Sequence, residues 1–187
     1  MADRYFLQRD EPLIRTRMLD ENLALVNNIM DYSIRLSDFE KGAWNNVNVV
    51  ITENKMNFLT LPPVPSAIAI WSGGGFKLSY LKNARWLKDK QIYYWGDIDE
   101  HGFQILHQLR SYYAQVKSVM MDNKTFDRFR EFSSIGERNK PDKLSLLNED
   151  EAALYQTLKS IQNNRLEQEK IPQEYVEVAF SQLGINI

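Results

Sequence analysis

Two aspartates separated by one residue stand where a predicted strand gives way to a predicted helix. Asp97 and Asp99 lie in the segment Trp95–Gly102, which reads WGDIDEHG. In an extended segment, residues two apart project to the same side, so the two carboxylates can be presented together. Such like charges repel unless a proton or a cation lies between them. Magnesium takes oxygen ligands and is often shared with a substrate phosphate, so the pair indicates a magnesium site.

Each aspartate also has an ordinary structural interpretation, Asp99 as a helix cap and Asp97 as a turn residue. A third acidic residue favours the metal site. Glu53 directly follows the predicted strand Val47–Thr52, and if that strand lies beside Gln91–Trp95, all three carboxylates meet at the ligand-binding edge of the sheet. The structural alternative for Glu53 is the first turn of a helix, where the macrodipole favours an acidic residue.

Other reactive groups make weaker candidates. His101 and His107 face different directions on one predicted helix and form a poor ligand pair. The glycines at 73–75 lack the spacing of a dinucleotide fingerprint or a P-loop, and they predict a tight turn. The chain has no cysteine, which excludes disulfides and thiolate metal sites. No Ser-His-Asp arrangement is visible.

Short runs rich in β-branched and aromatic residues predict the strands that would position the carboxylates. These runs are Val47–Thr52, Ala67–Trp71 and Gln91–Trp95, with Val116–Met121 as a fourth candidate. Helical spacing of apolar residues predicts helices at Gly75–Leu87, His101–Tyr113 and Thr125–Phe132. Nearly continuous apolar strands joined by helices indicate an α/β fold with a parallel sheet covered on both faces.

Two flanks surround this predicted core of residues 46–140. The N-terminal flank, residues 1–45, shows little periodicity, and Ser37 is predicted to cap a short helix that holds Phe39 and Trp44. The C-terminal helical extension, residues 141–187, begins with Asn148 and Glu151 in the pattern of a capping box. Pro172 then interrupts, and a last helix is predicted over Gln173–Leu183.

The charge of the chain does not favour nucleic-acid binding by itself. The formal net charge is -2, whereas nucleic-acid-binding domains usually carry a basic surface. Basic residues gather locally at Lys77, Lys82, Arg85, Lys88 and Lys90, a run that is also typical of a solvated helix face. No apolar run approaches the roughly 20 residues that cross a bilayer, and charges interrupt the N-terminus. We expect a soluble cytoplasmic protein with no membrane partner.

Four longer stretches carry a family resemblance. In chain order they read ITENKMNFLTLP, AIAIWSGGGF, YYWGDIDEHGFQILHQLR and NRLEQEKIP. An acidic residue after one strand and a DxD after a later one is the pattern of the Toprim fold of topoisomerases, bacterial primases and certain nucleases. Over residues 5–183 the chain resembles the C-terminal half of the JetD-like proteins of the Wadjet anti-plasmid systems, a family related to the A subunit of topoisomerase VI.

The resemblance implies a Rossmann-like Toprim sheet of about four parallel strands with helices on both faces and helical flanks. It also implies a DNA endonuclease that uses magnesium, with manganese as an alternative ion. Glu53, Asp97 and Asp99 match the metal-binding triad of the family. Further candidates for orienting the site or contacting phosphate are Asn54, Lys55, Lys77 and Arg165. The implied partners are double-stranded plasmid DNA, condensin-like SMC, kleisin and kite subunits, and a second copy in a homodimer.

The chain departs from the family in one respect. Family members carry an N-terminal half that this sequence lacks, so residues 1–45 are expected to be the remnant of a linker. Relatives that cleave through a tyrosine keep it in a separate domain, which makes water the expected nucleophile here. The competing hypothesis is a non-catalytic module that uses a Toprim scaffold for dimerisation and DNA docking, and the intact triad favours catalysis over it. Phosphotransfer through an aspartyl phosphate expects DxDxT, which the sequence does not match.

Overall fold

A six-stranded sheet forms the centre of the computed structural model, which describes residues 10–24, 28–73, 78–138 and 143–183. Its strands lie in the order β2-β1-β4-β3-β5-β6. They are β1 (Leu13–Met18), β2 (Asp31–Arg35), β3 (Asn48–Thr52), β4 (Ala67–Trp71), β5 (Ile92–Trp95) and β6 (Lys117–Ser118). The predicted α/β class is confirmed, with a parallel core of β4, β3, β5 and β6.

The register of the parallel core brings the ends of its strands to one edge. Thr52, the last residue of β3, pairs with Trp71 at the end of β4 and with Trp95 at the end of β5. Almost every residue of these three strands is buried, as expected for strands that are covered on both faces. The residues that follow β3 and β5, Glu53 and Gly96, therefore lie side by side.

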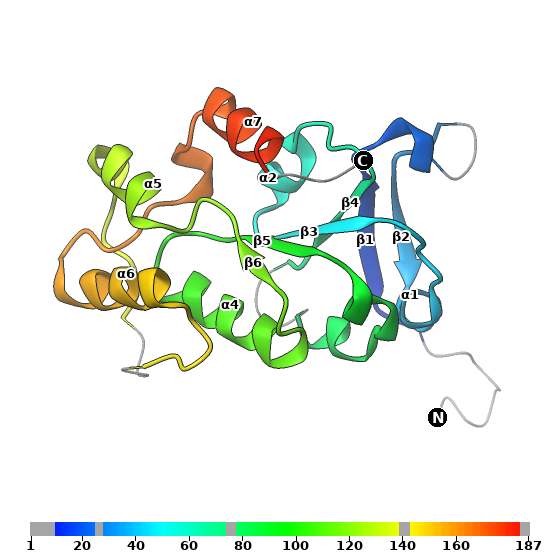
Figure 1. Cartoon of the computed structure of the whole chain (residues 1–187), viewed down its shortest axis with the longest axis horizontal. Helices are drawn as coiled ribbons and strands as arrows, with labels where there is room; N and C mark the ends of the chain where they lie inside the picture. The colour runs from blue at the N-terminus through cyan, green and yellow to red at the C-terminus, as the bar shows by residue number, and fades with distance from the viewer. Residues whose placement is uncertain (1–9, 25–27, 74–77, 139–142, 184–187) are drawn as a thin grey trace.

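Helices cover both faces of the sheet (Figure 1). On one face lie α4 (Glu100–Tyr112) and α6 (Glu149–Ser160), which contact each other through an edge-to-face pair of Phe103 and Tyr155. On the other lie α2 (Lys55–Thr60) and α7 (Gln173–Ser181), and Phe180 of α7 packs edge-to-face on Trp95. In the described part of the chain, no helix is long and apolar enough to cross a membrane.

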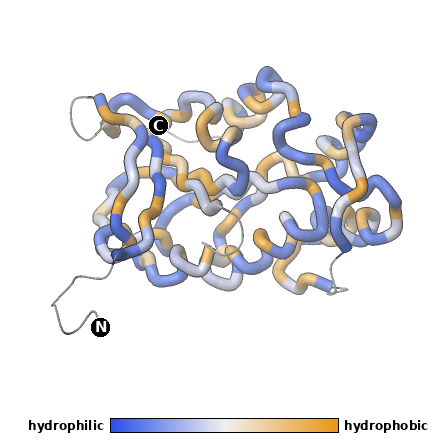
Figure 2. Tube along the Cα trace, turned by 180° about the vertical axis from the view of Figure 1, so that it is seen from behind, coloured by the Kyte–Doolittle hydropathy of each residue, from blue (hydrophilic) through white to orange (hydrophobic). Residues whose placement is uncertain are grey.

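The N-terminal segment extends the sheet, which the sequence analysis did not predict. β1 pairs antiparallel with both β4 and β2, so the sheet is mixed. Exposed and buried positions alternate along β1, and Figure 2 shows polar and apolar positions alternating in this edge pair of strands. Arg15 of β1 and Asp31 of β2 form a diagonal pair across the two strands, Nε to Oδ1 at 2.9 Å. The arginines of β1 face α2, where Arg17 Nη1 donates to the Leu59 carbonyl at 2.6 Å, and these charged residues hid the strand pattern.

The helix predicted over Gly75–Leu87 is wrong for its described part. From Ser79 the chain forms two 3₁₀ helices, η3 (Ser79–Asn83) and η4 (Arg85–Asp89), separated at Ala84, whose ψ of 85° is not helical. Tertiary contacts explain the break. The buried Tyr113 hydroxyl shares its proton between the carbonyls of Leu81 and Ala84, at 2.5 and 3.0 Å. The same carbonyls accept the N–H groups of Ala84 and Leu87, so this contact holds the chain in two short 3₁₀ turns.

The predicted caps had different outcomes. The capping box of Asn148 and Glu151 is confirmed at the start of α6. Ser37, however, lies inside α1 (Leu36–Lys41), because β2 runs directly into this helix and the Glu11 carboxylate accepts the Ser37 N–H at 3.1 Å. Phe39 lies in α1 as predicted, whereas Trp44 follows it.

The remaining elements are short. β6 contains only two residues of the predicted run. Two residues after the strand ends, Met120 adopts a φ of 54°, which is not an extended conformation. The other helices are η2 (Glu21–Leu23), α5 (Asn123–Arg128), η5 (Arg130–Phe132) and η6 (Gln168–Lys170).

Candidate metal centre

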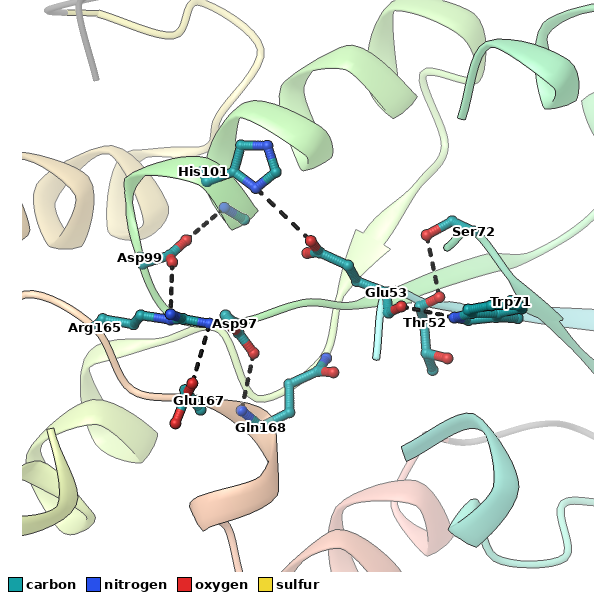
Figure 3. A network of polar contacts seen from close by, with 11 residues as sticks. Thr52, Glu53, Trp71, Ser72, Asp97, Asp99, His101, Arg165, Glu167 and Gln168 are labelled. Carbon is teal, nitrogen blue, oxygen red and sulfur yellow. Dashed lines mark hydrogen bonds and ion pairs between the residues drawn. The ribbon is translucent and has the colours of Figure 1, made fainter. Parts of the chain in front are cut away.

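The three predicted acidic residues lie at the carboxyl edge of β3 and β5 (Figure 3). Glu53 follows β3, and its backbone carbonyl accepts a hydrogen bond from the Trp71 indole of the neighbouring strand at 2.9 Å. Asp97 and Asp99 follow β5 at the turn into α4. The parallel register therefore brings Glu53 to the two aspartates, as the sequence predicted.

Asp99 caps α4, so its ordinary structural interpretation is also correct. Its Oδ1 accepts the Gly102 N–H at 2.7 Å, which leaves Oδ2 facing the site. Gly102 is required here, because a Cβ on it would lie 2.1 Å from the Asp97 carbonyl oxygen. The missing side chain lets the turn that carries both aspartates close against the first turn of the helix.

A C-terminal segment crosses this edge and supplies the remaining polar groups. Leu166 pairs antiparallel with Ile98, between the aspartates, and Arg165 pairs with Ser134. Asp97 Oδ1 then accepts the backbone N–H of Gln168 at 3.0 Å. The segment therefore holds Asp97 by its main chain.

Arg165 lies between the two aspartates. Its Nη2 is 3.0 Å from Asp97 Oδ2, and its Nε is 3.5 Å from Asp99 Oδ2. Glu167 holds the same Nη2 from the other side, at 3.1 Å. Burial lowers the pKa of the Arg165 guanidinium, but Asp97, Glu167 and Asp99 together outweigh burial and raise this pKa overall. Arg165 is the internal counter-ion of the site.

Glu53 and Asp99 are in an environment that disfavours their charge. Burial raises the pKa of Glu53, and the nearby charge of Asp97 raises it further. Burial also raises the pKa of Asp99, although the Gly102 N–H partly opposes this shift. Buried like charges of this kind are typical of functional sites. A cation added at this edge would relieve the repulsion between them.

A buried tyrosine lies beneath the carboxylates. Tyr94 is fully buried on β5, and its hydroxyl has no hydrogen-bond partner that meets normal geometry among the described residues. Burial raises the pKa of Tyr94 well above its usual value, and the charge of Glu53 adds to this effect. Gly96 makes room for the ring, because a Cβ on Gly96 would lie 2.2 Å from the Tyr94 hydroxyl oxygen.

The weaker candidates are placed differently from one another. Asn54 caps α2 by accepting the Met56 and Asn57 N–H groups, and it donates to Glu169. Lys55 is exposed and lies 5.9 Å above the Trp71 ring, next to the site without entering it. Lys77 lies outside the described residues.

Three neighbours of the triad were missed by the sequence analysis. His101, set aside there as a ligand, lies with its Nδ1 3.7 Å from Glu53 Oε1. Its place in the first turn of α4, directly after the aspartates, was the available signal. Glu167 and Gln168 stand beside the candidate Arg165 in the sequence, but only the bridge between Leu166 and Ile98 brings them to the site.

The donor set suits a hard cation in its chemistry, since carboxylate oxygens are the ligands that magnesium prefers. Its present arrangement is not a closed chelate. Within the described ranges, no three His, Asp or Glu side chains converge closely enough to hold a metal ion. Arg165 fills the space between the aspartates, and Glu53 points toward His101 (Figure 3).

The three members of the predicted basic cluster at positions 82, 85 and 88 do not belong to this edge. Lys82, Arg85 and Lys88 line a surface cavity of about 730 Å³ together with Lys41. Their helices precede β5, whereas the carboxylates follow it. The cluster therefore lies toward the amino end of that strand.

Comparison with protein families gives a match over most of the chain. The family model described as Wadjet protein JetD, C-terminal, matches residues 6–180. No curated protein matches the chain.

Proposed function

The chain belongs to the Wadjet JetD C-terminal family, and from this premise we propose that it is the metal-dependent DNA endonuclease domain of a Wadjet anti-plasmid system. The observation that supports the proposal most strongly is that Glu53, Asp97 and Asp99 lie at one edge of a parallel sheet, with the pKa values of Glu53 and Asp99 raised. Buried like charges destabilise the folded state, so a non-catalytic scaffold would have no use for them.

Each side chain has a part in phosphodiester hydrolysis by water. Asp97 and Asp99 would hold magnesium or manganese, with Glu53 as the third carboxylate. The bound ion would polarise the phosphodiester, lower the pKa of water and stabilise the leaving oxyanion. Glu53 suits proton transfer from the attacking water, because burial and Asp97 raise its pKa above the ordinary value. Arg165, whose Nη2 lies 3.0 Å from Asp97, would supply a guanidinium for the phosphate.

The partners are part of the proposal. We infer that the substrate is double-stranded plasmid DNA that a condensin-like complex of SMC, kleisin and kite subunits has engaged. A homodimer would place two such sites for cutting both strands. The alternative function is a non-catalytic DNA-docking and dimerisation module. The observation in its favour is that Asp97 is already satisfied, by the ion pair with Arg165 and the hydrogen bond from the Gln168 N–H.

Cleavage of closed circular plasmid separates these functions. Nicking and linearisation would be followed with magnesium or manganese in the presence of the partner subunits, for the native chain, Asp97→Ala and Glu53→Gln. Asp31→Asn, on the distant β2, is the matched control. We expect each triad variant to lose about 100-fold or more in rate, and the control to match the native chain. Equal cleavage by all chains would exclude the triad, and no cleavage by any would favour the docking module.

A further inference from the structure

The guanidinium of Arg165 uses the aspartate oxygens that a cation would need. Asp97 Oδ2 and Asp99 Oδ2 both face Arg165, at 3.0 and 3.5 Å. The remaining oxygen of each carboxylate accepts a backbone N–H, from Gln168 and Gly102 respectively. Those two N–H bonds hold the turn and the helix cap, so the Oδ2 atoms are the ones left to bind an added ion.

The Arg165 side chain can move while its backbone stays in place. Its main chain is fixed by two hydrogen bonds with Ser134, at 2.8 and 3.0 Å. Its side chain is 38% exposed, so solvent can receive the guanidinium. Glu167 contacts Nη2 and offers a partner that does not depend on the aspartates. The side chain can therefore leave the aspartates while its Cα stays in place.

We propose that Arg165 and the divalent cation exclude one another from Asp97 and Asp99, and that metal loading releases Arg165 to bind the DNA phosphate next to the metal. The proposal rests on the proposed function. A divalent ion between the aspartates repels the guanidinium and takes its oxygens, so both cannot remain there. A guanidinium freed from carboxylates is well suited to phosphate, because its planar donors match phosphate oxygens.

If Arg165 competes with the metal ion for the aspartates, removing its guanidinium should increase metal affinity. A purely supporting role of Arg165 predicts no such increase. Binding of Mn²⁺ would be measured by titration calorimetry, without DNA, for the native chain, Arg165→Met and Arg165→Lys. Arg15→Met, which breaks an arginine–aspartate pair on the distant β1, is the matched control. We expect Arg165→Met to bind Mn²⁺ about tenfold more tightly or more, Arg165→Lys to fall between, and Arg15→Met to equal the native chain.

A second measurement tests the phosphate contact. Affinity for a short DNA duplex would be measured with Ca²⁺ in place of Mg²⁺, in the presence of the partner subunits. Arg165→Met should weaken the Ca²⁺-dependent part of DNA binding about tenfold, although the variant binds metal more tightly. A variant that gains affinity for metal and for DNA together would contradict the exchange.

The outcomes separate this inference from the proposed function. If the native chain binds Mn²⁺ and Arg165→Met binds it equally or more weakly, the inference alone is overturned. Absence of Mn²⁺ binding in the native chain and in both Arg165 variants overturns both. Thermal unfolding checks that each variant is folded, and if Arg165→Met is not, Arg165→Lys decides, since native-like or weaker metal binding by that variant also overturns the inference.

Discussion

At the scale of single residues, the charge of Glu53 opposes folding in the metal-free protein. Burial and Asp97 raise the pKa of Glu53 above its ordinary value of 4.5. A carboxyl with a raised pKa in the folded state stabilises the fold fully below its unfolded pKa, and this stabilisation is lost as pH rises through the folded pKa. Glutamine resembles the protonated carboxyl, so it keeps this stability at every pH.

Glu53→Gln should therefore stabilise the metal-free chain at pH 7.5, by roughly 1 kcal/mol, and have little effect near pH 4. Urea unfolding at the two pH values, with a chelator present, measures the difference. The exposed pair of Arg35 and Asp38 offers a control, because Asp38→Asn should show no gain at pH 7.5. A Glu53→Gln variant that is less stable than the native chain at pH 7.5 would contradict the electrostatic account.

Gly96 and Tyr94 form a second residue-scale unit. Adding a Cβ at Gly96 would place it 2.2 Å from the Tyr94 hydroxyl oxygen, and the fully buried ring cannot turn away. Gly96→Ala should destabilise the fold by about 1–3 kcal/mol, as overpacking does. In a Tyr94→Phe background the same substitution should cost at least about 0.5 kcal/mol less. Additive free energies of unfolding would show that the two residues do not touch.

The part of the candidate site that lies at the ends of strands could be predicted from the sequence. Glu53, Asp97 and Asp99 follow two strands whose pairing can be inferred, so their proximity could be predicted. The ion pairs of Arg165 could not be predicted, because they depend on the bridge between Ile98 and Leu166. That bridge has no signal in local residue spacing.

At the scale of elements, the turn between β5 and α4 depends on a helix position that excludes a side chain. Alanine in a helix is normally about 1 kcal/mol more favourable than glycine. Gly102→Ala should have the opposite sign and cost about 2 kcal/mol, because its Cβ would lie 2.1 Å from the Asp97 carbonyl oxygen. Gln104→Ala in the same helix is the control and should change stability by less than about 0.5 kcal/mol. A more stable Gly102→Ala variant would contradict this packing.

The first turn of α4 is also held from the C-terminal side. Glu100 is fully buried and pairs with Arg138 at 3.2 Å and Lys159 at 3.5 Å. Asn164 donates to the same carboxylate at 3.3 Å. The start of α4 is thereby tied to α6 and to the segment that carries Arg165. This link explains why residues far apart in sequence meet at one edge.

Elements of the parallel core were predictable, and those at its margin were not. Apolar runs such as Ala67–Trp71 are buried on both faces and can be recognised as strands from their composition alone. β1 carries Arg15 and Arg17 on the face that lies against α2, and its place in the sheet is set by its pairing with β4. The split between η3 and η4 follows from the Tyr113 hydroxyl, a contact between distant segments.

At the scale of the whole molecule, the distribution of charge predicts weak DNA binding by the chain alone. The formal net charge is -2, and the basic side chains Lys82, Arg85 and Lys88 lie away from the carboxylate edge. We expect a dissociation constant for duplex DNA weaker than about 1 μM at physiological salt. Fluorescence anisotropy with and without the partner subunits measures this affinity, which should tighten when they are added. Nanomolar binding by the chain alone would contradict the expectation.

The position of the bound ion tests the central claim most directly. Crystals of the chain soaked in Mn²⁺ would be measured for anomalous scattering. We predict a peak about 2.0–2.2 Å from oxygens of Asp97 and Asp99, on the side of Glu53, with the Arg165 guanidinium turned away. If saturating Mn²⁺ gives no anomalous peak at this edge and Arg165 still lies between the two aspartates, the assignment of a metal centre is contradicted.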